Sequence, residues 1–207
     1  MHIAILTFPG FNEIDSLVAL GILNRVKAAD WRVTLCGPET SVTSMNGVTV
    51  ETQSRLCDLP GADAVLVGSG LHTRDIVDDP KRLSTLRLDP TRQLIGAQCS
   101  GALILARLGL LDGVPACTDL TTRPWVQEAG VEVLDRPFHA NGNLATAGGC
   151  LASPYLAGWL IARCQGEEAA RAALHYVAPV GEKAAYVERA LAHIRPGLPD
   201  SQEGYAP

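Results

Sequence analysis

The stretch Gln93-Leu94-Ile95-Gly96-Ala97-Gln98-Cys99-Ser100-Gly101-Ala102-Leu103-Ile104-Leu105-Ala106 joins two apolar runs across one cysteine. The first run is typical of a buried strand. The second continues to Leu111 with Arg107 as its only charge, so it predicts a helix that is buried on nearly every side and ends at Asp112-Gly113. Cys99 is therefore expected at a strand-to-helix corner, the geometry of a nucleophile elbow.

The thiol of Cys99 has two interpretations. Ser100 and Gly101 are small, and the first N–H groups of the predicted helix have no partner within it. Together with the helix dipole they favour a thiolate, which predicts a thiol pKa below the free value of roughly 8.5. The alternative is inert packing, the usual role of a buried free cysteine. We expect that role for Cys36, Cys57, Cys117 and Cys164. Cys150 follows Gly148-Gly149, which allows a place near the site, but packing is the favoured role for it as well.

Composition limits the classes of function. The 207 residues fit one domain, and an apolar content of 47% is enough for a large core. A formal net charge of −5 argues against a nucleic-acid partner or an anionic membrane surface. No apolar run reaches the roughly 18 residues of a membrane span, and the N-terminus lacks the pattern of a signal peptide. The six cysteines form no CxxC pair, and the histidines show no metal-ligand spacing. We therefore expect a cytoplasmic chain without metal or cofactor.

Apolar runs and turn signals alternate along the chain. Strands are predicted at 2–8, 31–36, 63–67 and 144–147, and helices from Asn12, at 83–88, and near 153–165, 167–177 and 182–194, with His72, Thr73 and Arg74 in a polar loop. This alternation predicts a single α/β domain with a mainly parallel sheet over residues 1–195, and an extended tail over 196–207.

Three predicted strands end in segments that suit a site. These are Pro9-Gly10 leading to Asp15, then Gly68-Ser69-Gly70, and finally Gln98-Cys99. In parallel sheets, ligands bind at the carboxyl ends of the strands, so these segments are expected to converge. Asp15 has an alternative role, because an acid at the third helical position stabilises a helix through a capping box and the dipole. If it instead meets the Cys99 sulfur, repulsion raises its pKa and the pair shares a proton.

These segments, together with Ala97-Gln98-Cys99-Ser100-Gly101-Ala102, Leu110-Leu111-Asp112-Gly113 and Asn141-Gly142-Asn143-Leu144-Ala145-Thr146-Ala147-Gly148-Gly149, resemble the ThiJ/PfpI superfamily and, within it, the isocyanide hydratase-like branch. The resemblance implies a three-layer, flavodoxin-like sandwich similar to class I glutamine amidotransferases. It implies Cys99 as nucleophile and Asp15 as its acidic partner. It also implies that the backbone N–H groups of Gly70 and Ser100, with Ser69 beside them, bind an anion or the substrate.

Two departures from the superfamily pattern bear on the reaction. Ser100 occupies a position where protease-like members have a histidine. Asp119 occupies a second position where many relatives have a histidine. A proton carrier is therefore absent, which disfavours peptidase chemistry and leaves the role of Asp119 open. The resemblance implies a cofactor-free lyase that hydrates isocyanides, and a homodimer. The alternatives are a ligand-binding regulatory domain, a redox sensor, and a glyoxalase- or deglycase-type stress protein.

Overall fold

Within the described residues, 1–199, seven strands of the computed structural model form one central sheet, in the order β5-β2-β1-β6-β7-β9-β8. The strands of this sheet are β1 (His2–Leu6), β2 (Arg32–Gly37), β5 (Ser54–Arg55), β6 (Ala64–Val67), β7 (Leu94–Gln98), β8 (Phe138–Asn141) and β9 (Leu144–Ala147). All neighbouring pairs are parallel except β8 with β9. A separate hairpin, β3 (Ser41–Thr43) and β4 (Thr49–Glu51), forms around the Asn46-Gly47 turn.

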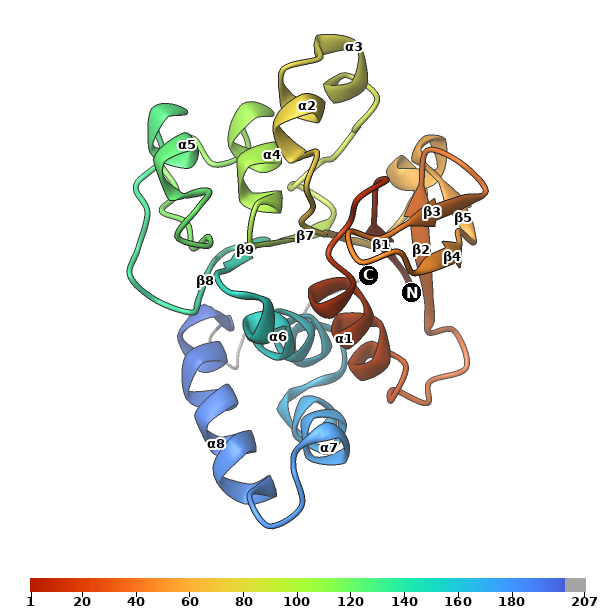
Figure 1. The fold of residues 1–207 in the computed structure, drawn as a ribbon. Helices are drawn as coiled ribbons and strands as arrows, with labels where there is room; N and C mark the ends of the chain where they lie inside the picture. The colour runs from red at the N-terminus through yellow and green to blue at the C-terminus, as the bar shows by residue number, and fades with distance from the viewer. Residues whose placement is uncertain (200–207) are drawn as a thin grey trace.

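Helices cover both faces of this sheet (Figure 1). One face packs against α1 (Glu13–Leu23), α6 (Ser153–Gln165), α7 (Glu167–Val177) and α8 (Lys183–Ile194). The other packs against α2 (Thr73–Val77), α4 (Gly101–Arg107) and α5 (Arg123–Glu128), with α3 (Pro80–Leu83) beyond them. The predicted three-layer α/β sandwich with a mainly parallel sheet is therefore confirmed.

The central strands are apolar along their whole length because both of their faces are covered. Every residue of β6 and β7 is buried, including Gln98 at the end of β7. Such strands read as continuous apolar runs rather than as alternating ones. Two separate cores result, one on each face of the sheet. The carboxyl ends of β1, β6 and β7 share one edge of the sheet, as the parallel pairing requires.

Two local predictions between β6 and β7 are wrong. The expected polar loop at Thr73 and Arg74 is the start of α2, whose Ile76 and Val77 are buried. The helix expected at 83–88 ends at Leu83 instead, because α3 begins earlier. Asp79 caps that helix by accepting hydrogen bonds from the N–H groups of Lys81 and Arg82, and a proline follows the cap.

The C-terminal segment begins with a short 3-10 turn, η3 (Arg195–Gly197), in which the Gly197 carbonyl accepts a hydrogen bond from Trp159 Nε1. Most of the predicted tail at 196–207 lies outside the described residues. Among the helices that are described, none combines the length and apolar character needed to cross a bilayer.

Candidate active site

Cys99 lies at the predicted corner, between the end of β7 and the start of α4. Its φ is +46°, which makes it the single non-glycine residue with positive φ in the part of the chain described. Backbone hydrogen bonds hold this strained residue, since its N–H donates to Ala147 O (2.8 Å) and its carbonyl accepts from Thr118 Oγ1 (2.7 Å). A Cβ at Gly101 would lie 2.5 Å from Val67 O, so only glycine allows α4 to start this close to β6.

Asp15 lies in the first turn of α1, and its side chain points into the protein rather than along the helix end. The residue is 1% exposed, and Oδ2 accepts a hydrogen bond of 2.6 Å from Ser69 Oγ. Asn12 is the helix N-cap, accepting from Ile14 N, but the Asn12 N–H donates to Ser69 O. The capping box in which Asp15 would accept that N–H is therefore not formed.

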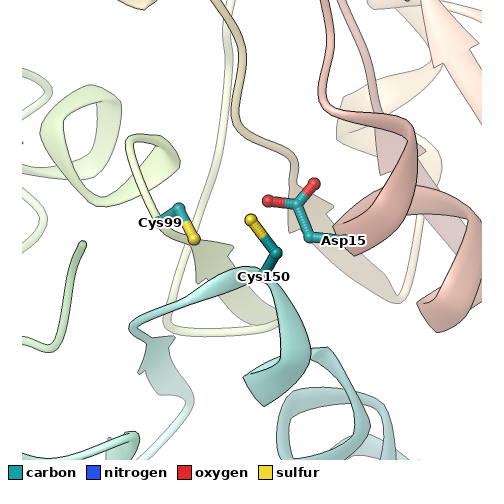
Figure 2. A group of neighbouring side chains, drawn as sticks. All are labelled: Asp15, Cys99 and Cys150. Carbon is teal, nitrogen blue, oxygen red and sulfur yellow. The ribbon is translucent and has the colours of Figure 1, made fainter. Parts of the chain in front are cut away.

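A second cysteine joins this pair. One carboxyl oxygen of Asp15 and the sulfur atoms of Cys99 and Cys150 all lie within 4.8 Å of one another. Figure 2 shows the three side chains converging from three separate segments, with the carboxyl group facing the two sulfurs. Cys150 begins η2 (Cys150–Ala152), which follows β9 after Gly148-Gly149, and its sulfur accepts a hydrogen bond of 3.0 Å from Asn12 Nδ2.

Burial sets the ionisation of Asp15 and Cys99. Desolvation raises the pKa of Asp15 to about 6, against the opposing effect of the hydrogen bond from Ser69. Desolvation also raises the pKa of the Cys99 thiol, and the nearby Asp15 carboxylate raises it further. The predicted lowering of the thiol pKa is therefore wrong. Burial and the nearby Asp15 carboxylate raise this pKa by more than the dipole of the short helix α4 lowers it. Neither group ionises easily beside the other, so the pair holds one proton near neutral pH.

Gly70 and Ser100, the predicted anion-binding pair, lie side by side. The Gly70 N–H donates to Ser100 Oγ (3.2 Å), which lies 2.8 Å from Thr73 Oγ1. Thr73 Oγ1 in turn donates to Gly70 O (3.0 Å), so the three groups close a ring of hydrogen bonds. The Gly70 N–H thus has an acceptor within the protein, and Ser69 is hydrogen-bonded to Asp15.

A cavity of about 480 Å³ opens beside Cys99. Its walls include Ser69, Gly70, Ser100, Asp119 and Cys150, and also the apolar side chains of Met45, Leu71 and Trp125. Within this wall the Arg74 guanidinium stacks on the Trp125 ring at 4.8 Å. Asp119 Oδ1 accepts hydrogen bonds from the N–H groups of Thr121 and Thr122, so this acid orders the turn before α5.

The sequence did not reveal two residues of the site, namely Thr73 and Thr118, and it favoured packing over a place in the site for Cys150. Thr73 and Thr118 act through their hydroxyl groups on backbone and side-chain atoms of distant segments. Cys150 follows Gly148-Gly149 at the end of a predicted strand, which was the available signal that it reaches the same sheet edge. His72 is exposed and pairs with Asp75, as expected for a surface histidine.

Known proteins share this fold and part of this sequence. A sequence model described as the DJ-1/PfpI family matches residues 1–163. An isonitrile hydratase from Pseudomonas putida is 27% identical over 155 residues, which are 73% of this chain and 67% of that protein.

Solved structures give the same picture. DJ-1 from Schizosaccharomyces pombe superposes with a TM-score of 0.73 and 17% identity over 86% of this chain and all (100%) of that one. A cysteine-to-alanine mutant of a DJ-1 superfamily protein from Salmonella typhimurium has a TM-score of 0.73 and 26% identity, covering 85% of this chain and 97% of that one.

Proposed function

Because this chain belongs to the DJ-1/PfpI family, we propose that it is a cysteine-dependent enzyme that hydrates isocyanides to N-substituted formamides. The similarity to an isonitrile hydratase, at 27% identity, supports this reaction over others of the family. The proposal assigns Cys99 as the nucleophile and Asp15 as the residue that carries the proton. It needs neither a metal nor a cofactor in the reaction.

One observation carries the proposal, namely the buried pair of Asp15 and Cys99 beside the cavity. The carboxyl group is 1% exposed and its pKa is raised to about 6, so it gains and loses a proton near neutral pH. A general acid or base works best when its pKa lies near the operating pH. The isocyanide carbon must gain both a nucleophile and a proton, and this pair supplies one of each.

The reaction begins when the proton of the pair passes from Sγ of Cys99 to the Asp15 carboxylate. The thiolate attacks the terminal carbon of the isocyanide, and the Asp15 carboxyl protonates the same carbon, which gives a thioimidate on sulfur. Water then adds to the carbon; Asp15 accepts one of its protons and the nitrogen takes the other, which leaves an oxyanion on the carbon. The C–S bond breaks, the formamide leaves, and sulfur and carboxylate again share one proton.

The remaining site residues support these steps. Ser69 Oγ holds Oδ2 of Asp15, which leaves the other carboxyl oxygen available to move the proton. We propose that Gly70 and Ser100 bind the substrate end that gains charge, exchanging a hydrogen bond of their ring for one to the ligand. The apolar side chains of Leu71 and Trp125 suit the hydrocarbon substituent of an isocyanide and exclude water from it.

Turnover with cyclohexyl isocyanide tests the assignment. Formamide production is followed by NMR with purified, chelator-treated protein under reducing conditions, and methylglyoxal is assayed in parallel. The proposal expects catalytic formamide production. Turnover of the dicarbonyl alone would replace the hydratase with a glyoxalase-type function, and no turnover of either would remove the enzymatic assignment.

We further propose that the chain forms a homodimer with the site near the interface. Two large apolar side chains of the cavity wall, Met45 and Leu71, are exposed, and so is Leu151, which follows the wall residue Cys150 in the sequence. Exposed apolar surface near a binding site is typical of a protein–protein contact. Sedimentation velocity at micromolar concentration is expected to give a dimer, and a monomer would contradict this proposal.

A further inference from the structure

Three potential metal ligands meet beside the cavity although they are far apart in the sequence. They come from the first turn of α1, from the corner after β7, and from the start of η2. We propose that Asp15, Cys99 and Cys150 form a binding site for a zinc-class divalent cation, with a fourth coordination position open toward the cavity. This site shares Asp15 and Cys99 with the proposed reaction, but the reaction itself uses no metal.

The distances suit such an ion. Zinc binds cysteine sulfur at about 2.3 Å and carboxylate oxygen at about 2.0–2.2 Å in a tetrahedral arrangement. Neighbouring ligand atoms are then roughly 3.5–3.8 Å apart. The carboxyl oxygen and the two sulfurs already lie within 4.8 Å of one another, at most about 1 Å beyond these separations. The carboxyl group faces the sulfurs before any ion is bound (Figure 2).

Asp15 provides an independent sign that this cluster lacks a partner. Its Oδ1 atom is buried and has no hydrogen-bond partner among the described residues. Buried polar atoms are nearly always satisfied, because an unsatisfied one costs free energy. Ser69 holds Oδ2 and so directs the carboxyl group, as outer hydrogen bonds commonly do for a metal-binding carboxylate. A cation at the centre of the cluster would give Oδ1 the missing partner.

The sulfur atoms also have supporting donors. Asn12 Nδ2 donates to the sulfur of Cys150 at 3.0 Å, and Gln98 Nε2 donates to the sulfur of Cys99 at 3.7 Å. Amide donors of this kind stabilise thiolate ligands and fix their orientation. Binding would release both thiol protons to solvent, so two thiolates, one carboxylate and one divalent ion carry a net charge of −1. That equals the charge of the carboxylate with two neutral thiols, and the buried charge does not grow.

A bound ion has a consequence for the proposed reaction, and this consequence alone rests on the proposed function. Cys99 cannot attack a substrate while its sulfur is a metal ligand. Zinc would therefore act as a reversible inhibitor that chelation removes. The metal site itself stands or falls by binding measurements made without any isocyanide.

Cobalt titration of the chelator-treated, reduced, full-length protein is the test. Co²⁺ bound by two thiolates in a four-coordinate site gives an intense sulfur-to-metal charge-transfer absorption and strong visible d–d bands. We expect both to saturate at one equivalent per chain and to disappear when Zn²⁺ is added. Weak absorption typical of six-coordinate cobalt, or saturation at another stoichiometry, would overturn the proposal.

Variants assign the ligands. Cys150→Ala and Cys99→Ala are each expected to remove most of the charge-transfer absorption. Asp15→Asn is expected to keep it but to weaken Zn²⁺ binding by more than the about 10–100-fold typical of losing an outer-shell partner. Cys57→Ser is the matched control, because Cys57 is the exposed cysteine that would bind metal adventitiously. Thermal unfolding confirms that each variant is folded, and Cys150→Ser repeats the test if Cys150→Ala is not.

A signal that survives in both Cys99→Ala and Cys150→Ala but is lost in Cys57→Ser would overturn the assignment. The outcome is independent of the hydratase assay. A protein that binds one cobalt through these residues and hydrates no isocyanide would leave the metal site standing and reject the proposed reaction.

Discussion

Asp15 and Glu167 both lie in the first turn of a helix, α1 and α7 respectively, yet the surroundings shift the pKa values of their carboxyl groups in opposite directions. Burial raises the pKa of Asp15 to about 6, whereas the hydrogen bonds from Arg195 lower the pKa of Glu167. Glu167 accepts from Arg195 Nη2 at 2.7 Å and from Arg195 Nε at 3.1 Å, at the edge of solvent. Position in a helix therefore does not decide the role of an acid, and its surroundings do.

The surroundings of the two acids also distinguish the candidate active site from the surface of α7 and α8. Around Glu167 the charges of α7 and α8 are paired at the surface, and Arg171 contacts both Glu167 and Glu188. Among residues 1–199, no cation forms an ion pair with the buried Asp15 carboxyl group, and its partners are a hydroxyl and two sulfurs. Ionisable groups whose pKa is strongly shifted by burial cluster at functional sites, which makes Asp15 a candidate for a functional residue. Four substitutions and one titration sharpen or break this comparison.

The largest effect is expected from Cys99→Ala. Removing the sulfur removes the nucleophile, so isocyanide turnover is expected to disappear entirely while the fold is kept. Alanine meets the same positive-φ strain as cysteine at this corner, because both residues carry a Cβ. Formamide production by NMR and circular dichroism on the same sample check both statements. Residual turnover comparable to wild type would show that another group attacks the substrate.

Asp15→Asn is expected to reduce turnover by about 10²–10⁴-fold, the usual contribution of a general acid–base group. Asparagine keeps the shape and the hydrogen bond from Ser69 but cannot give up a proton. Glu13→Gln is the matched control, since Glu13 lies in the same helical turn and its carboxylate accepts from Asn46 instead. Equal rates for the two variants would assign Asp15 a structural role only.

The stability of the protein is expected to depend on pH through Asp15. The pKa of its carboxyl group is about 6 in the folded state and about 3.8 when unfolded, so the folded state binds more protons between these values. Stability from this group is thus present below about pH 4 and is lost as pH rises to 6. Asp15→Asn, which stays neutral, is expected to be more stable than wild type by up to about 3 kcal/mol at pH 7.

Urea unfolding of wild type and Asp15→Asn between pH 4 and 7 measures this difference. The two curves are expected to converge toward pH 4 and to separate as pH rises. An asparagine variant that is less stable at pH 7 by about 1 kcal/mol or less would instead match an acid that acts only on the helix dipole.

The smallest effect is expected from Glu167→Gln. Its carboxylate is paired but partly exposed, so solvent screening limits its contribution to about 0.5–1 kcal/mol. The variant is expected to lose that much stability at pH 7, and to keep wild-type turnover. Urea unfolding at low and high salt checks the origin, since salt is expected to reduce the difference between the variant and wild type.

Features that depend on local sequence patterns were predicted correctly. The helices 153–165 and 167–177 were predicted with the bounds that the structure shows, because an apolar stripe or a buried run is a local pattern. The corner at Cys99 was predicted for the same reason. The proximity of Asp15 and Cys99 was predicted from the rule that parallel strands end at one sheet edge, and from the family resemblance.

What the sequence could not give was the depth of burial and the convergence of distant segments. The thiol pKa was predicted in the wrong direction because the dipole of α4 is a local feature, whereas the burial of Cys99 is not. Cys150 approaches the pair because β9 lies beside β7, and its neighbours in sequence carry no sign of a reactive thiol. The helix at 73–77 was predicted as a loop because its first residues are polar and only two apolar residues, Ile76 and Val77, follow them.

The protonation of Asp15 is the central claim, and a pH titration of the ¹³C-labelled carboxyl carbons by NMR tests it most directly. Asp15→Asn and Glu167→Gln assign the two resonances by their disappearance. The structure predicts that Asp15 titrates with a midpoint of about 6 and that Glu167 titrates below the usual range of a glutamate. An Asp15 midpoint at about 3.9, the value of an unperturbed aspartate, would contradict the account.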